Sequence, residues 1–414
     1  MSPAIPLPPY RVLAAALRVT TERLAREVAA PSAIAPDWNP VEWIVARAAS
    51  AMQGISVLLA NRLAWRGPQG WQDFLSTQRR QAQHRHEHIG FLLRQIDGCL
   101  SAAGLACVAL KGSALRRYGM YAAGERPMGD VDLLVQPGEL ARVAQALRSL
   151  DYLSATRTRR HLALEPRLGG PLAFGEHPDN PLKIELHEVV AEPLPWRPVD
   201  ITAALWTQKP RPGLNDYAHS RELMRHLLLH AAGNIRAHAL RQVQLHDISE
   251  LGATFRDDDW AALLDTPDSG GGAWWMWPVL ELTGRYYPAS VPTRAADFRQ
   301  RCPPLLRAAS THHTLARISW SNLRIAAFPG ICWARSLREA LGFMRSRIAP
   351  RREALEELEL SLRMLPSLRQ VPWYGEKHVA RMIRWVFSRP PRVQTLVSVR
   401  AAFADDAGDI LNGA

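Results

Sequence analysis

Two aspartates, Asp130 and Asp132, stand two residues apart in the segment GDVDLLV. The segment has the apolar character of a buried strand, in which side chains i and i+2 project to the same face. Two adjacent carboxylates repel each other unless a cation lies between them, and hard oxygen ligands suit Mg²⁺. The pair therefore predicts a Mg²⁺ site, with a solvated strand end as the simpler alternative.

A second polar strand face follows in the segment KIELHEVV, where polar and apolar residues alternate. The alternation places Glu185 and His187 on one face, and Glu188 breaks it, which predicts that the strand ends there. Glu185 is thus a candidate third carboxylate, able to complete a metal site or to act as the base for an incoming hydroxyl. Taken alone, a strand with one solvated face also explains the pattern.

A predicted strand-to-helix turn carries the third element, in the segment LKGSAL, where Gly112 and Ser113 open a helix. Glycine lets an anion approach the backbone closely, and the first turn of a helix offers it free N–H groups. The segment contains no GxxxxGK[ST] motif, so P-loop chemistry is not supported. An ordinary glycine turn with a serine N-cap is the alternative to a phosphate site.

Several histidines lie further along the chain. His226 and His230 are one turn apart on a predicted helix, and His246 and Asp247 are on the next. Such spacing can bind zinc. Histidines of this kind more often pack between helices with hydrogen bonds, and we predict that role here. If His226 and His230 instead open onto the cleft, they line the acceptor pocket.

Three regions of different pattern must position these residues. Residues 1–100 show the i, i+3, i+4 apolar spacing of helices, and Gly104 lies where a glycine would end the last of them. Residues 101–195 alternate short strands, among them HLALE and PLAFGE, with helices, which predicts an α/β sheet domain. After a proline-rich stretch, residues 213–400 return to helical spacing.

The composition is that of an ordinary globular protein, with 414 residues of which 47% are hydrophobic and 22% charged. No apolar run reaches the roughly 18 residues that a transmembrane helix needs. The N-terminus lacks the basic region, apolar block and cleavage site of a secretory signal. Four scattered cysteines without a CxxC pair indicate neither a disulfide framework nor a structural zinc site. These features predict a cytoplasmic enzyme.

The net charge of +12 favours anionic partners, because basic residues gain affinity by releasing counterions from phosphates. Only four of the 51 basic residues are lysines, and the arginines are dispersed except in the region from Arg335 onward. Nucleic acid is therefore a possible partner but not the favoured one, since nucleoside triphosphates or membrane phosphates explain the charge equally well.

In this order, LKGSAL, RPMGDVDLLV and IELHEVV resemble the signature of the polymerase-β-like nucleotidyltransferase superfamily. That signature is a hydrophobic-G-[GS] turn, a [DE]h[DE]h strand and a later h[DE]h strand. More narrowly, the chain looks like a poorly characterised bacterial nucleotidyltransferase family found near peptide-natural-product and exopolysaccharide genes. The resemblance implies an α+β fold, with a polymerase-β-like mixed sheet domain flanked by N-terminal and C-terminal helical regions.

The resemblance also implies a role for each matched residue. The implied site residues are Asp130, Asp132 and Glu185 for catalysis and a two-metal Mg²⁺ site, and Lys111, Gly112, Ser113 and Arg126 for the phosphates of an NTP. Sixteen residues separate Ser113 from Asp130, more than is usual in the superfamily, and this extra length could carry Arg126 toward the site.

The function implied is transfer of a nucleoside monophosphate from an NTP to a hydroxyl acceptor on a small molecule, peptide or protein, as in natural-product or polysaccharide biosynthesis. The acceptor hydroxyl would attack the α-phosphate and release pyrophosphate. One alternative is a toxin-like or tRNA-directed nucleotidyltransferase. Another is a non-catalytic accessory protein of a biosynthetic cluster, using its basic region from Arg335 to Arg400 on an anionic membrane or a partner.

Overall fold

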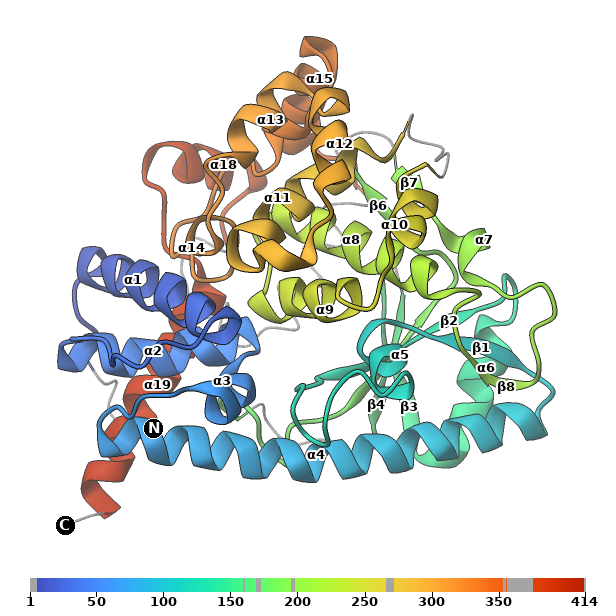
Figure 1. Ribbon diagram of the computed structural model, residues 1–414, viewed down its shortest axis with the longest axis horizontal. Coiled ribbons are helices and arrows are strands. Elements are labelled where there is room, and N and C mark those ends of the chain that lie inside the picture. Colours follow the sequence, from blue (N-terminus) through green and yellow to red (C-terminus); the bar gives the residue numbers. More distant parts are fainter. Residues whose placement is uncertain are drawn as a thin grey trace.

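The computed structural model describes residues 6–158, 161–168, 173–194, 198–265, 272–352, 355 and 375–412. A mixed sheet lies between the long helix α4 (Gln69–Ala102) and a group of helices from the C-terminal half, as Figure 1 shows. This combination of helices with a mixed sheet confirms the α+β class. The finer assignment to the polymerase-β-like topology stays a prediction.

The strands of the sheet are short: β1 (Ala106–Ala109), β2 (Asp130–Val135), β3 (Tyr152–Arg157), β4 (Leu162–Pro166), β5 (Lys183–His187) and β8 (Gly213–Asn215). They lie in the order β3-β4-β5-β2-β1-β8. β2 runs parallel to β5 and antiparallel to β1. β1 also pairs in parallel with β8, which lies beyond the predicted sheet region 101–195. A separate ladder joins β6 (Ala191–Pro193) and β7 (Pro198–Asp200).

Helices surround the sheet and form both ends of the described chain. The α-helices besides α4 are α1 (Tyr10–Ala29), α2 (Pro40–Gln53), α3 (Ser56–Arg62), α5 (Lys111–Arg117), α6 (Leu140–Leu147), α7 (Thr202–Leu205), α8 (Ser220–Ala237), α9 (Gln242–Gly252), α10 (Asp257–Leu264), α11 (Trp277–Tyr286), α12 (Ala296–Arg301), α13 (Pro304–Ser310), α14 (Leu315–Ile318), α15 (Leu337–Ile348), α18 (His378–Phe387) and α19 (Val393–Asn412). Short 3-10 turns are η1 (Arg148–Leu150), η2 (Ala273–Met276), η3 (Pro288–Ser290), η4 (Thr293–Ala295) and η5 (Ile331–Trp333). α19 packs against α2, so the two ends of the chain come together (Figure 1).

No single helix in the described part of the chain is long and apolar enough to cross a bilayer. Only α2 and α3 taken together reach that length and hydropathy, and they meet at a bend of 111°.

Helix α4 connects the N-terminal helices to the sheet. It has 34 residues and therefore a length of about 51 Å. Its first half buries Trp71 and Phe74 in the N-terminal core, and its last turns bury Ile96 and Leu100 against the sheet. Gly104 follows with a φ of +66°, which confirms the glycine predicted just after the helix end.

Alternation along β2 divides its side chains between two cores. Val131, Leu133 and Val135 are buried against α4 and α6. Leu134 projects from the opposite face and is buried among residues of α8, α9 and α11. Asp132 shares the face of Leu134 because the two are separated by one intervening residue. The β2 carboxylates therefore project toward α8 and α9 and away from α4.

One strand prediction is wrong where the structure describes it. Residues 173–176 of PLAFGE form a loop, and residues 171 and 172 lie outside the described residues. The Asn180 side chain accepts a hydrogen bond from Ala173 N–H and donates one to the Gly175 carbonyl, with lengths of 2.6 and 2.9 Å. This side chain supplies the polar partners that a neighbouring strand would otherwise provide. HLALE is confirmed as the start of β4.

His246 on α9 is fully buried between the rings of Tyr121 and Tyr287, at centroid distances of 5.8 and 5.7 Å. Its packing role is as predicted, but the predicted hydrogen bonds are wrong: neither ring nitrogen has a hydrogen-bond partner among the described residues, and the Glu250 carboxylate lies 3.6 Å from Nε2. Burial, together with the charges of Arg62 and Arg126, lowers the pKa of His246 to about 3. The folded chain therefore keeps this ring neutral over a wide pH range.

We expect the free energy of unfolding to fall as the pH drops below about 6.5, because only the unfolded chain then protonates His246. The substitution His246→Phe keeps an aromatic ring and removes the titration. The loss of stability between about pH 7 and pH 5 should shrink by about 2 kcal/mol in this variant. Denaturant unfolding at both pH values measures it, with the exposed His84→Phe as the control. An unchanged pH dependence in His246→Phe would contradict the assignment.

Candidate active site

The three predicted carboxylates meet on one face of the sheet. The parallel register of β2 and β5 pairs Asp132 directly with Glu185, and Asp130 lies two residues before Asp132. All three line one cavity of about 350 Å³. Asp130 is exposed at the start of its strand, Glu185 is half-buried, and Asp132 is only 4% exposed.

Asp132 is the most strongly held of the three. Its Oδ1 accepts a hydrogen bond of 2.8 Å from Lys111 Nζ and one of 2.9 Å from His187 Nε2. Burial alone would raise the pKa of Asp132, but the Lys111 charge and the bonds from His187 and Lys111 hold that pKa well below its ordinary value. Asp132 is therefore ionised at any pH at which the protein is folded and these partners stay in place.

The other two carboxylates lack such direct cationic partners at short distance among the described residues. Although Asp130 meets solvent in the cavity, the surrounding protein raises its pKa, and the charge of Asp132 raises it further. Burial, then Asp132 and Asp130, raise the pKa of Glu185 to about 7. The face thus carries more negative charge than Lys111 balances, which favours binding of an additional cation.

A buried relay fixes Lys111 at the site. Lys111 has a positive φ of 47°, an unusual conformation for a residue with a side chain. Its backbone N–H donates to Tyr217 Oη at 3.2 Å, and that hydroxyl lies 2.7 Å from His226 Nδ1. Burial lowers the pKa of His226 well below its ordinary value, so the neutral ring accepts a hydrogen bond from the Tyr217 hydroxyl. His226 is thus a hydrogen-bonded packing residue, as predicted, with Tyr217 as its partner.

His230 differs from His226. It is partly exposed, lines the cavity, and lies with its Nε2 3.2 Å from the Asn234 side-chain amide. The two histidines of the pair therefore have different surroundings, one enclosed behind Lys111 and one open to the cavity.

Gly112 and Ser113 begin α5 but differ in their access to the cavity. Gly112 lines it, and a Cβ added there would lie 2.5 Å from Arg126 Nη1, so the position has no space for a side chain. Ser113 is 1% exposed, is not among the cavity-lining residues, and its hydroxyl has no hydrogen-bond partner in the part of the chain that the structure describes. For Ser113 to contact a phosphate as predicted, its side chain or the residues that cover it would have to move.

Arg126 reaches the cavity on the long segment between α5 and β2, where the sequence places it. Its Nε and Nη2 donate to the two carboxylate oxygens of Asp247, both at 2.6 Å. Tyr121 also donates to Asp247, at 2.8 Å. Asp247 on α9 is 1% exposed, so this pair joins α9 to the segment that leads into β2.

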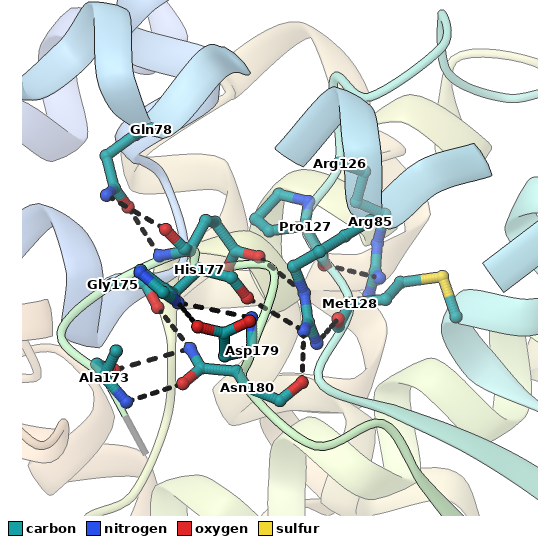
Figure 2. Close-up of polar contacts among 11 residues, drawn as sticks. Gln78, Arg85, Arg126, Pro127, Met128, Ala173, Gly175, His177, Asp179 and Asn180 are labelled. Carbon is teal, nitrogen blue, oxygen red and sulfur yellow. Dashed lines mark hydrogen bonds and ion pairs between the residues drawn. The ribbon is translucent and has the colours of Figure 1, made fainter. Parts of the chain in front are cut away.

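Arg85 is a buried cation near the cavity that was not predicted from the sequence. From α4 its guanidinium donates to the carbonyls of Met128 at 3.0 Å and Asn180 at 2.7 Å, and Figure 2 shows it between these two loops. Its Nε also lies 3.2 Å from Glu176, which lines the cavity. Nothing in the sequence distinguishes it from the other arginines, because its partners are about 43 to 95 residues away along the chain.

Arg241, at the residue before α9, was also missed. It is exposed and lines the same cavity, and its Nε donates to the Met52 carbonyl at 3.0 Å. The cavity therefore combines an acidic floor on the sheet with a cationic rim of Lys111, Arg126 and Arg241. Such a surface suits a polyphosphate that is bound together with metal cations.

Comparison with known proteins identifies the family of the chain. Residues 39–288 match the model of a family described as uncharacterised nucleotidyltransferase. The chain belongs to this nucleotidyltransferase family. The matched range includes every strand of the sheet and all of the residues just described, which confirms the family predicted from the three motifs. Neither the curated proteins nor the solved structures contain a match to the chain.

We expect Asp247→Asn to lower the free energy of unfolding by about 3 kcal/mol, because it leaves a largely buried guanidinium without its carboxylate. Asp216→Asn is the matched control. Asp216 pairs with Arg117 at 2.7 Å but its side chain is 50% exposed, so its loss should cost at most about 1 kcal/mol. Urea unfolding of both variants measures the difference. Equal losses would show that the Arg126–Asp247 pair does not anchor α9.

Proposed function

We propose that this chain is a Mg²⁺-dependent enzyme that transfers a nucleoside monophosphate from an NTP to a hydroxyl acceptor. The observation that carries the proposal is the direct pairing of Asp132 with Glu185 across β2 and β5, next to Asp130 and in one cavity with Lys111 and Gly112. Membership of the nucleotidyltransferase family supports the general reaction. The metal, the acceptor and the residue roles are our inference.

The residues present fit a magnesium–triphosphate complex. Asp130, Asp132 and Glu185 offer hard oxygen ligands on one face, and the raised pKa values of Asp130 and Glu185 indicate that this face gains stability from added positive charge. Gly112 lines the same cavity, where the Arg126 guanidinium lies in the space that a side chain would fill. When bound, Mg²⁺ would supply positive charge to the attacking and leaving oxygens.

The chain's own residues then have distinct tasks. Lys111, Arg126 and Arg241 bind the phosphate oxygens and hold the triphosphate so that its α-phosphate lies over the carboxylates. Glu185 accepts the proton of the acceptor hydroxyl as its oxygen forms a bond to the α-phosphorus. The bond from that phosphorus to the β-phosphate bridging oxygen breaks, and pyrophosphate leaves with the electron pair.

The acceptor is proposed as a hydroxyl on a small molecule, peptide or protein. The setting in natural-product or polysaccharide biosynthesis rests on the family resemblance of the three motifs. The cationic rim faces the cavity of the carboxylates, and a bound nucleotide accounts for it without a tRNA acceptor.

We expect Asp130→Asn to reduce transfer of label from an α-³²P NTP by on the order of a thousandfold, the equivalent of several kcal/mol of lost charge stabilisation. The melting temperature should stay the same or rise, because the substitution removes repulsion from Asp132. The assay measures labelled product from each of the four NTPs in an extract that supplies acceptors.

The control is Asp179→Asn, at a side chain that is 79% exposed on the loop after Glu176. It should keep wild-type transfer. Full activity of Asp130→Asn would disprove the role of this carboxylate. Transfer of label from γ-³²P NTP instead of α-³²P NTP would show that the enzyme transfers the terminal phosphate and that the proposed reaction is wrong.

A further inference from the structure

A second cavity of about 210 Å³ shares Lys111, Glu185 and His230 with the first one. Histidines are concentrated in its lining: His161, His187, His226 and His230. Three of the groups around it converge on one point. The nitrogen or oxygen atoms of His161, Glu185 and His187 all lie within 4.8 Å of one another.

The sheet itself brings these three residues together. β4 and β5 are antiparallel, with Leu162 opposite Leu186 and Ala163 opposite Glu185. Continued by one residue, this register places His161 opposite His187, and their ring centroids are 5.3 Å apart. The backbone of His161 is further fixed by Thr158, whose hydroxyl accepts from His161 N–H at 3.2 Å.

The distances within the cluster match the separation between two ligands of one metal ion better than they match the length of a hydrogen bond. His161 Nε2 lies 3.7 Å from one oxygen of Glu185, and His187 Nε2 lies 3.8 Å from the other. A hydrogen bond would be about 3 Å long. Two ligands at tetrahedral angles around a metal ion are about 3.4 Å apart when each metal–ligand bond is about 2.1 Å.

Two imidazoles and one carboxylate form a ligand set of intermediate softness. Such sets bind first-row transition metals, whereas Mg²⁺ prefers oxygen ligands alone. The His187 nitrogen that donates to Asp132 would exchange its proton for the metal ion, since a ligating nitrogen must be unprotonated. Three protein ligands leave at least one coordination position of the metal ion unfilled. All three residues line the second cavity, so a ligand in that cavity can reach the unfilled position.

We propose that His161, Glu185 and His187 bind one divalent transition-metal ion of the Mn²⁺ to Zn²⁺ series, whose open position faces the histidine-lined cavity and takes the oxygen of the acceptor. The metal site is argued from the geometry of these three residues, but it shares Glu185 with the proposed function, and a Glu185 that binds this ion does so in place of accepting the acceptor's proton. The assignment of its open position to the acceptor rests on that function, with Glu185 lying between the two sites.

Cobalt(II) titration of the full-length protein in the presence of excess Mg²⁺ tests the site, because bound Co²⁺ gives a visible absorption spectrum that depends on its ligands. We expect one equivalent to bind with a spectrum of nitrogen and oxygen ligands. His161→Gln should weaken binding by at least about 10-fold to 100-fold. His84→Gln, at an exposed histidine of α4, is the control and should bind Co²⁺ as the wild type does.

Asp130→Asn separates this inference from the proposed function. It should abolish nucleotidyl transfer and leave the Co²⁺ spectrum and affinity almost unchanged. If neither the wild type nor any variant transfers nucleotide, but His161→Gln still weakens Co²⁺ binding, the proposed function fails and the metal site stands. If His161→Gln binds Co²⁺ as tightly as the wild type, or Asp130→Asn weakens binding as much as His161→Gln, the ion sits on the aspartates and the inference is overturned.

Discussion

Repulsion among three carboxylates on one sheet face is the constraint on which the rest of the site depends. Neighbouring strands lie about 4.8 Å apart, so unscreened charges on Asp132 and Glu185 repel each other by several kcal/mol. Lys111 and His187 offset this at Asp132, whereas burial and then the neighbouring carboxylate charges raise the pKa values of Asp130 and Glu185. The residues around the three carboxylates keep them together on one face, where added cations would reduce their repulsion.

Those surroundings are themselves rigid polar networks. The buried relay of Tyr217 and His226 fixes the backbone of Lys111. The Arg126–Asp247 pair joins α9 to the segment before β2, and Arg85 joins α4 to the carbonyls of Met128 and Asn180 (Figure 2). Each network connects a segment next to the sheet to a helix distant in sequence and so supports the position of the carboxylates and the cationic rim.

Local patterns in the sequence predicted those features that depend on the geometry of a single strand. The period of two in GDVDLLV and KIELH correctly placed Asp130 with Asp132 and Glu185 with His187, because a strand alternates its faces regardless of its partners. The family resemblance implied that Glu185 joins Asp130 and Asp132 in one site, but the pairing of β2 with β5 that brings them together depends on packing of the whole domain. Arg85, Arg241 and His161 had no local signal, because their partners are distant in sequence or arise only from strand pairing. PLAFGE was wrongly predicted as a strand, because its residue pattern does not reveal that the Asn180 side chain bonds to the backbone of Ala173 and Gly175.

The most direct test of this account is a crystal structure with Mg²⁺ and a non-hydrolysable NTP analogue. The account predicts Mg²⁺ at about 2.1 Å from carboxylate oxygens of both Asp130 and Asp132. It also predicts that Lys111 Nζ exchanges its bond to Asp132 for a phosphate oxygen. A triphosphate bound elsewhere, with Lys111 still 2.8 Å from Asp132 and no cation on either aspartate, would contradict it.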